Sequence, residues 1–198
     1  MIGADAIIRC LEAEGVDTVY GYPGVAICPF YNSILDTDIQ TILVRTEQNA
    51  AHAASGYARI SGKPAVCIAT SGPGAINLVT AIATAYADSI PIVCITGQVN
   101  RDQIGSDVFQ EVDITGAAEP FVKHSYLLDD PEDLPRVFKE AFYIARTGRP
   151  GPVLVDITKD VTAAVTDFER KEKIEIKDDT VINVDELKTV AEIINKAK

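Results

Sequence analysis

One stretch decides the fold of this chain: Thr41-Ile42-Leu43-Val44-Arg45-Thr46-Glu47-Gln48-Asn49-Ala50-Ala51-His52-Ala53-Ala54-Ser55-Gly56-Tyr57-Ala58-Arg59. Its first four residues are apolar or β-branched and predict a short buried strand. Thr46 can cap the helix that follows, which places Glu47 in the first turn. The many alanines let neighbouring backbone approach this helix closely. A carboxylate at such a junction lies where open α/β sheets bind their ligands, although a surface complement to the helix dipole would also explain it.

The same order of strand and helix extends in both directions from this stretch. Apolar runs predict strands at 17–20, 39–44, 64–70, 90–96, 121–127 and 152–157, and helical spacing predicts helices at 4–14, 26–35, 47–61, 78–86 and 131–145. Residues 100–120 are expected to be irregular and polar. Strands that alternate with helices and are almost wholly apolar predict a three-layer α/β/α fold with a mostly parallel sheet.

The composition excludes several classes of protein. A formal net charge of −11 argues against a nucleic-acid surface, no apolar run is long enough for a membrane span, and the N-terminus shows no signal peptide. The four cysteines are far apart and include no Cys-x-x-Cys pair, so we interpret them as small buried hydrophobes of a cytoplasmic protein.

The domain organisation follows from a change in composition after Val161. Residues 162–198 hold nine acidic and seven basic side chains, a denser charge than in the preceding part. We therefore expect one domain over 1–161, a solvated linker over 162–184, and a helix over 185–198. One face of this last helix is apolar, with Leu187, Val190 and Ile194, and we expect it to be the first helix of a further domain.

A glycine-rich turn, Gly72-Pro73-Gly74, follows the predicted strand at 64–70. It does not fit the dinucleotide or phosphate-loop patterns, because Asn77 replaces the third glycine and no Gly-Lys-Ser/Thr follows. Pro73 also removes a backbone donor that an anion would use. The turn therefore favours contact with a flat polar heterocycle over a phosphate, and a tight strand-to-helix turn is the simpler alternative.

Several motifs occur together in a specific order: Gly21-Tyr22-Pro23-Gly24, Arg45-Thr46-Glu47-Gln48, Thr70-Ser71-Gly72-Pro73-Gly74 with Asn77, Ile95-Thr96-Gly97-Gln98, Phe109-Gln110-Glu111, and Gly148-Arg149-Pro150-Gly151-Pro152 with Asp156 and Lys159. In this combination the chain resembles the N-terminal, pyrimidine-binding domain of thiamin-diphosphate-dependent enzymes. Within that superfamily it most resembles the catalytic subunits of acetolactate synthases. The resemblance covers essentially all of residues 1–161.

The resemblance implies an activity and a role for Glu47. In the family, the matching glutamate hydrogen-bonds a ring nitrogen of the cofactor's aminopyrimidine, which can then take the proton from the thiazolium carbon. Pyruvate is decarboxylated on thiamin diphosphate, and the two-carbon unit is added to pyruvate or 2-oxobutyrate in branched-chain amino-acid biosynthesis. The implied partners are small 2-oxoacids, a second copy of the chain in a dimer or tetramer, and a small regulatory subunit.

The resemblance also assigns the site residues. The implied cofactor-binding residues are Pro23, Gly24, Glu47, Thr70, Pro73, Gly74 and Asn77. The implied substrate-side residues are Val25, Ala26, Phe109, Gln110 and Lys159, although a solvated lysine would equally explain Lys159. No residue of this chain is assigned to a metal. Mg²⁺ and FAD are implied for the full-length enzyme through regions that this sequence does not contain, because it has no Gly-Asp-Gly run followed by Asn. We interpret His52 as a packing histidine.

Two residues depart from the family pattern, and two alternatives stay open. Thr46 stands where the family commonly has His, and Val25 stands where it has Gly, which bears on the choice of subfamily. Glu47 counts against glyoxylate carboligase, which lacks this acid. One alternative is another thiamin-diphosphate decarboxylase or carboligase of 2-oxoacids. The other is a non-catalytic binding or regulatory subunit with the same fold. We expect this chain alone to be inactive.

Overall fold

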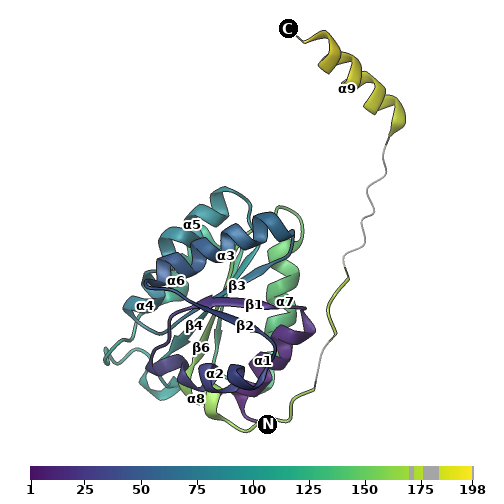
Figure 1. The fold of residues 1–198 in the computed structure, drawn as a ribbon. Coiled ribbons are helices and arrows are strands. Elements are labelled where there is room, and N and C mark those ends of the chain that lie inside the picture. Colours follow the sequence, from purple (N-terminus) through teal and green to yellow (C-terminus); the bar gives the residue numbers. More distant parts are fainter. Residues whose placement is uncertain (170–171, 176–182, 198) are drawn as a thin grey trace.

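A computed structural model describes residues 1–169, 172–175 and 183–197. Its centre is a six-stranded, all-parallel sheet in the order β2-β1-β3-β4-β6-β5 (Figure 1). The strands are β1 (Thr18–Gly21), β2 (Gln40–Leu43), β3 (Ala65–Ala69), β4 (Ile92–Gln98), β5 (His124–Leu128) and β6 (Val153–Thr158). The prediction of an α/β fold with a mostly parallel sheet is therefore confirmed.

Helices cover both faces of the sheet. Figure 1 shows one layer with α1 (Gly3–Ala13), α2 (Cys28–Ser33) and α7 (Leu134–Arg146), and a second layer with α3 (Glu47–Ser61), α5 (Val79–Ala87) and α6 (Ile114–Ala118). Shorter helical segments are α4 (Pro73–Ile76), α8 (Lys159–Ala163), η1 (Val25–Ile27), η2 (Ile34–Asp36), η3 (Arg101–Gln103), η4 (Glu119–Phe121) and η5 (Pro131–Asp133). The last described helix is α9 (Val184–Lys196).

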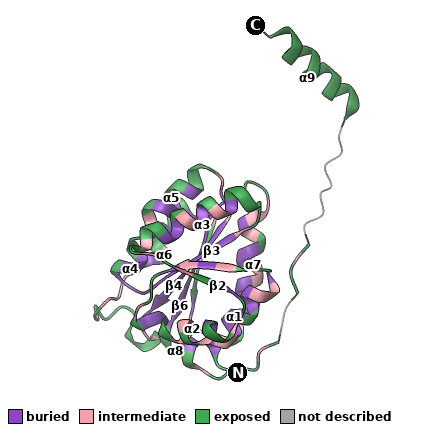
Figure 2. Ribbon diagram, viewed as in Figure 1, coloured by how far each residue is buried: buried purple, intermediate pink, exposed green. Residues whose placement is uncertain are grey.

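The two cores follow from the alternation of side chains along the strands. In β3, Val66 and Ile68 pack against the layer of α1, α2 and α7. Cys67 and Ala69 pack against the layer of α3 and α5. Most alanines of α3 lie buried on the sheet, because a helix without large side chains can approach it closely. Figure 2 shows this burial concentrated in the strands and the inner helix faces.

The structure corrects four local expectations. The strand β2 is not buried but is an edge strand, with Leu43 64% exposed. Thr46 takes the N-cap position of α3, but its side chain makes no capping hydrogen bond. His52 is exposed and is not a packing residue. Residues 100–120 are not irregular throughout, because α6 buries Ile114 and Ala118 against the core.

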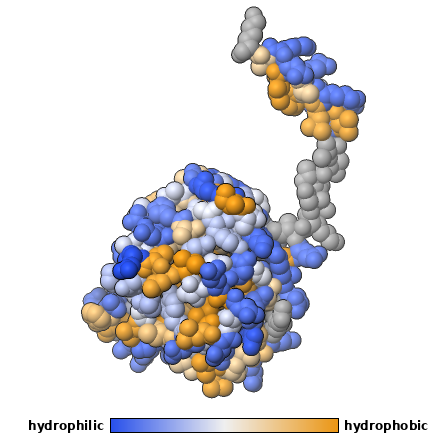
Figure 3. All heavy atoms as spheres, viewed as in Figure 1, coloured by the Kyte–Doolittle hydropathy of each residue, from blue (hydrophilic) through white to orange (hydrophobic). Residues whose placement is uncertain are grey.

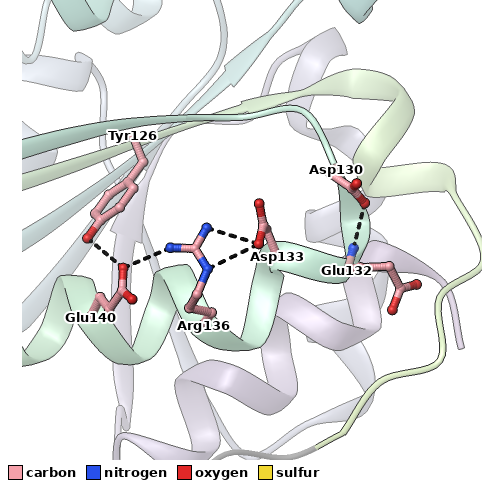
Figure 4. Close-up of polar contacts among 6 residues, drawn as sticks. All are labelled: Tyr126, Asp130, Glu132, Asp133, Arg136 and Glu140. Atoms are coloured by element: carbon pink, nitrogen blue, oxygen red, sulfur yellow. Dashed lines mark hydrogen bonds and ion pairs between the residues drawn. The ribbon is translucent and has the colours of Figure 1, made fainter.

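A polar network joins β5 to α7 (Figure 4). Arg136 forms ion pairs with Asp133 and Glu140, and the Tyr126 hydroxyl donates to Glu140 Oε2 at 3.1 Å. Asp130 accepts a hydrogen bond from the backbone N–H of Glu132 at the start of η5. Each exposed pair contributes little stability by itself, so the network mainly fixes the path of the chain from the strand into the helix.

The chain beyond α8 returns to the N-terminus. The Gly3 N–H donates to the carbonyl of Ala164 at 2.8 Å, and the Thr166 N–H donates to that of Met1 at 2.9 Å. Thr166 is buried, and Phe168 packs against the core of α1 and α7. Ordered packing therefore continues for several residues beyond Val161.

All described residues of α9 are exposed. Its apolar side chains gather on one side of the helix, as Figure 3 shows, and Asn183 caps its first turn by accepting from the Asp185 and Glu186 N–H groups. Within the described ranges, no helix has both the length and the apolar character that a membrane crossing requires.

The four cysteines are free thiols, and three of them fit the prediction of small buried residues. Cys67 and Cys94 are paired neighbours in β3 and β4, with their sulfur atoms 3.4 Å apart. Burial raises the pKa of Cys10 to about 12. Cys28 is the exception, because it is exposed at the start of α2.

This exposure predicts a simple titration result. A thiol reagent added to the folded chain should modify Cys28 rapidly and the other cysteines slowly, because reaction requires an accessible thiolate. Absorbance at neutral pH should show one fast equivalent, rising to four in denaturant. Cys28→Ser, the matched control, should abolish the fast phase, and a fast phase that survives in it would contradict the burial of the other three.

Candidate functional site

A crevice opens at the carboxyl edge of the sheet between β1 and β3. The connection after β1 leads to α2 on one face of the sheet, whereas the connection after β3 leads to α4 and α5 toward the other. The two loops, 21–24 and 70–77, therefore diverge at this point. Such a switch in direction is where open α/β sheets bind ligands.

Glu47 lies beside this crevice, at the start of α3. Its carboxylate Oε2 accepts a hydrogen bond from the Asn77 Nδ2 at 2.9 Å. Gly74 approaches it from the opposite loop: a Cβ placed on Gly74 would lie 3.3 Å from Glu47 Oε1 and 2.7 Å from Thr70 Cγ2. The glycine therefore keeps open the space in front of the carboxylate. Glu47 itself is half-buried, so the described chain desolvates it only in part.

The first cleft has a volume of about 410 Å³ and is lined by all seven predicted cofactor-binding residues. They come from three loops that are far apart in the sequence: Pro23 and Gly24 after β1, Glu47 after β2, and Thr70, Pro73, Gly74 and Asn77 after β3. Tyr22 also lines this cleft and was not predicted. It stands inside the quoted Gly21–Gly24 motif, but nothing in the sequence distinguished it from a loop aromatic.

The second cleft, of about 280 Å³, is lined by all five predicted substrate-side residues: Val25, Ala26, Phe109, Gln110 and Lys159. Sequence reasoning missed the other lining residues, which are Ser71, Gln98, Val99, Asn100 and Gln103. Most of these come from the end of β4 and the segment after it. The sequence feature that could have identified them is the run of polar residues that follows the buried strand β4.

The two clefts share a wall made of Val25, Phe109 and Gln110. Phe109 is 88% exposed and Val25 is 67% exposed. Gln110 has a backbone φ of 60°, which is uncommon for a residue other than glycine. It packs on Gly72, where a Cβ would lie 2.8 Å from the Gln110 Cα. The wall is therefore built by close contact between the loop 70–77, which contains Gly72, and the segment that carries Gln110.

A buried polar network lies behind the second cleft. The Thr96 hydroxyl donates to Asp156 Oδ1 at 2.6 Å, and the Gln98 Nε2 donates to Asp156 Oδ2 at 2.9 Å. The pKa of Asp156 is raised from its ordinary value of 3.8 to about 7, mainly by burial and to a smaller extent by the carboxylate of Asp113, against the effect of these two hydrogen bonds. This buried carboxyl is linked to the second cleft through Gln98.

The raised pKa of Asp156 predicts a pH-dependent stability. Between about pH 4 and pH 7 the folded chain holds a proton that the unfolded chain has released, so the free energy of unfolding should fall as the pH rises through this range. Urea unfolding of the chain at pH 5 and at pH 8 measures the effect. Asp156→Asn should flatten this part of the profile, and an unchanged profile in that variant would assign the dependence to another group.

Another hollow, of about 660 Å³, is lined by Arg146, Glu172, Lys173 and Glu175. Arg146 pairs there with Glu14, with 3.7 Å between Nη2 and Oε2. Its walls are charged side chains and include none of the predicted site residues. The hollow is therefore a poor match for a flat heterocycle.

Residues 1–117 match the sequence family described as "Thiamine pyrophosphate enzyme, N-terminal TPP binding domain". This match spans more than half of the chain. The chain belongs to the thiamine pyrophosphate enzyme family. The family's name identifies thiamine pyrophosphate, another name for thiamin diphosphate, as the ligand of this type of domain, which agrees with a cleft at the switch point of the sheet.

Relatives of this thiamine pyrophosphate domain carry the names of acetolactate synthases. The chain is 55% identical to an acetolactate synthase of Arthrospira platensis over 170 residues, covering 84% of this chain and 29% of that protein. It is 55% identical to the acetolactate synthase isozyme 2 large subunit of Escherichia coli over 169 residues, covering 85% and 31%. It is 52% identical to the acetolactate synthase large subunit of Corynebacterium glutamicum over 177 residues, covering 89% and 28%. The chain thus spans less than a third of these relatives.

Proposed function

We propose that this chain is the N-terminal, pyrimidine-binding part of an acetolactate synthase, which joins a two-carbon unit from pyruvate to a second 2-oxoacid. The observation that carries the proposal is the position of Glu47: a carboxylate, oriented by Asn77, at the cleft of a thiamine pyrophosphate domain. The names of the relatives supply the reaction. Branched-chain amino-acid biosynthesis is the pathway that this reaction implies.

The residues of the first cleft fit an aminopyrimidine ring. The cleft offers a carboxyl group, two side-chain amides, two prolines and two glycines. Gly24 and Gly74 both pack on Thr70, and a Cβ on Gly24 would lie 2.4 Å from the Thr70 Cβ. Prolines and glycines present flat surfaces without long side chains, which suits a planar heterocycle.

In this proposal the chain's own residues position the ring and hold one proton. The Asn77 amide donates to Glu47 Oε2, so the second carboxylate oxygen, Oε1, is free to face the ligand from beside Gly74. A carboxyl at this place can share a proton with a ring nitrogen. When bound, thiamin diphosphate supplies a carbon nucleophile and an electron sink for the decarboxylation.

The second cleft receives the 2-oxoacids in this proposal. Lys159 offers a positive charge to a carboxylate at one end, and Phe109 and Gln110 form the wall toward the first cleft. Val25 belongs to the same wall, and its side chain reduces the space beside the substrate. A different 2-oxoacid carboligase of the family is the second candidate, and the observation that favours it is this exposed Val25 in place of the usual glycine.

We extend the proposal to the organisation of the whole protein. Residues 1–161, with the packed residues that follow them to Phe168, form the pyrimidine-binding domain, the rest of 162–184 a linker, and 185–198 the first helix of a central domain. Mg²⁺, FAD and the diphosphate would be bound by other parts of the full-length enzyme. We also propose that the full-length protein is a homo-oligomer. A small regulatory subunit is proposed because relatives are named large subunits. The free thiols support a proposed cytoplasmic location.

The test is the activity of the full-length protein that contains this chain. With pyruvate, thiamin diphosphate and Mg²⁺ it should form acetolactate, and the 198-residue chain alone should form none. Formation of acetaldehyde or of another condensation product instead would favour the second candidate. Absence of any turnover of 2-oxoacids in the full-length protein would overturn the catalytic proposal in favour of a binding or regulatory subunit.

A further inference from the structure

The segment between β4 and α6, residues 99–113, carries Phe109 and Gln110 into the wall between the two clefts. Its middle is folded by Glu111, whose carboxylate accepts hydrogen bonds from the N–H groups of Gly105, Ser106 and Val108. These bonds lie within the segment. They give it a shape but do not attach it to the sheet.

Apart from its continuation into α6, the segment is joined to other described elements by two hydrogen bonds, by an ion pair of 3.6 Å between Arg101 Nε and Asp129 Oδ2, and by the packing of Val112 on the core of α3 and α5. The Arg101 N–H donates to Asp160 Oδ1 at 3.1 Å near the beginning. The Gln98 Nε2 donates to the carbonyl of Val112 at 2.8 Å near the end, two residues after Gln110. The second bond comes from a side chain that is only 4% exposed, at the carboxyl end of β4.

The side-chain amide of Gln98 is held in one orientation. Its Oε1 accepts from the Val99 N–H at 2.9 Å, and its Nε2 donates both to Val112 and to Asp156. The Val112 carbonyl can only accept a hydrogen bond and the Val99 N–H can only donate one, so these two backbone groups hold the NH₂ end of the amide toward Val112 and toward Asp156. Every polar atom of this buried side chain is satisfied, which makes the network rigid.

We infer that Gln98 is a positioning residue, which fastens the segment bearing Phe109 and Gln110 to the sheet and so fixes the wall between the two clefts. Asp156 acts one step further away, by orienting the amide. The consequence for 2-oxoacid binding rests on the proposed function. The attachment itself does not.

Two substitutions that exchange a side-chain amide and a carboxyl group distinguish this positioning role from a general effect on the stability of the fold. Gln98→Glu keeps the shape but places a carboxyl beside Asp156, and the two buried carboxyl groups share one proton, so the donor to the Val112 carbonyl is lost while a contact with Asp156 remains. Adding Asp156→Asn keeps the buried pair without a shared proton, because the new Nδ2 can donate to the carboxylate introduced at position 98 while Oδ1 still accepts from Thr96. It does not restore a donor to Val112. Asp156→Asn alone is the matched control, since an asparagine can still accept from Gln98.

Two measurements read out the result. In the 198-residue chain, ¹⁵N order parameters of residues 104–111 should fall from about 0.85 to below about 0.6 in Gln98→Glu and in the double variant, and stay high in Asp156→Asn. In the full-length protein, the KM for pyruvate should rise about tenfold in the same two variants, with kcat changed much less. A loss of folded enzyme would lower the apparent kcat and leave KM unchanged.

Recovery of rigid amides and a normal KM in the double variant would overturn the inference, since Gln98 would then matter only as the partner of Asp156. Unchanged values in Gln98→Glu would overturn it too. If Gln98→Glu does not fold, Gln98→Met, which removes the amide without adding a charge, should give the same loss of order. A wild-type protein that forms no acetolactate would overturn the proposed function, and the order parameters then decide the attachment alone.

Discussion

Replacing Glu47 with glutamine in the full-length protein is expected to slow hydrogen exchange at the thiazolium carbon of bound thiamin diphosphate by about 10²–10⁴-fold, the usual effect of a positioned proton donor or acceptor. Glutamine keeps the size of the side chain, and its amide oxygen can still accept from the Asn77 Nδ2. It cannot hold an exchangeable acid proton. Quenched-flow NMR of the thiazolium proton in deuterated buffer measures the rate directly.

The cofactor affinity distinguishes this role from binding. In Glu47→Gln the dissociation constant of thiamin diphosphate should change far less than the exchange rate. Glu119→Gln is the matched control, because Glu119 lies in η4 and lines neither cleft. Near-normal exchange together with weak cofactor binding would show that Glu47 only binds the ring, and the proposed proton transfer would then be wrong.

Gly72→Ala is expected to produce a large loss of stability at the site. Gly72 has φ 62° and ψ −126°, a conformation that glycine alone adopts without strain. A Cβ would also lie 2.8 Å from both the Cα and the carbonyl oxygen of Gln110. Backbone strain costs about 1–3 kcal/mol and overpacking about 1–3 kcal/mol, so the free energy of unfolding should drop by several kcal/mol in urea.

Gly62→Ala separates the two contributions. Gly62 also has a positive φ, 69°, but no atom lies within 4 Å of its added Cβ. This control should cost only about 1–2 kcal/mol, the penalty of a left-handed conformation. Equal losses in the two variants would contradict the tight contact between Gly72 and Gln110, and with it the description of the wall between the clefts.

Much of this site could be predicted because the sheet is parallel. All twelve predicted residues follow the ends of strands or belong to the segments just beyond them, and parallel strands bring those ends to one edge. Glu47 and Asn77 are 30 residues apart, and they meet because α3 and α4 begin at that edge. A strand that ends in glycine, proline or a carboxylate is visible in the sequence.

What could not be predicted depends on strand order and on contacts between distant segments. The run at 41–44 looked buried, but its burial is decided by its place at the edge of the sheet, next to β1 alone. His52 lies on a helix whose alanines give little indication of which side faces the core. The bond from Gln98 to Asp156 spans 58 residues, and no local pattern links the two.

The order of the strands also determines when this domain can fold during synthesis. Among the described strands, β5 pairs with β6 alone, although β5 leaves the ribosome first. The central strand β4 likewise gains its second neighbour only from β6. Val153–Thr158 therefore complete two pairings at once. A nascent chain halted just before them would carry β4 with an open edge of buried aliphatic residues, a state prone to join other chains. Its exposure to chaperones should be greatest at that length.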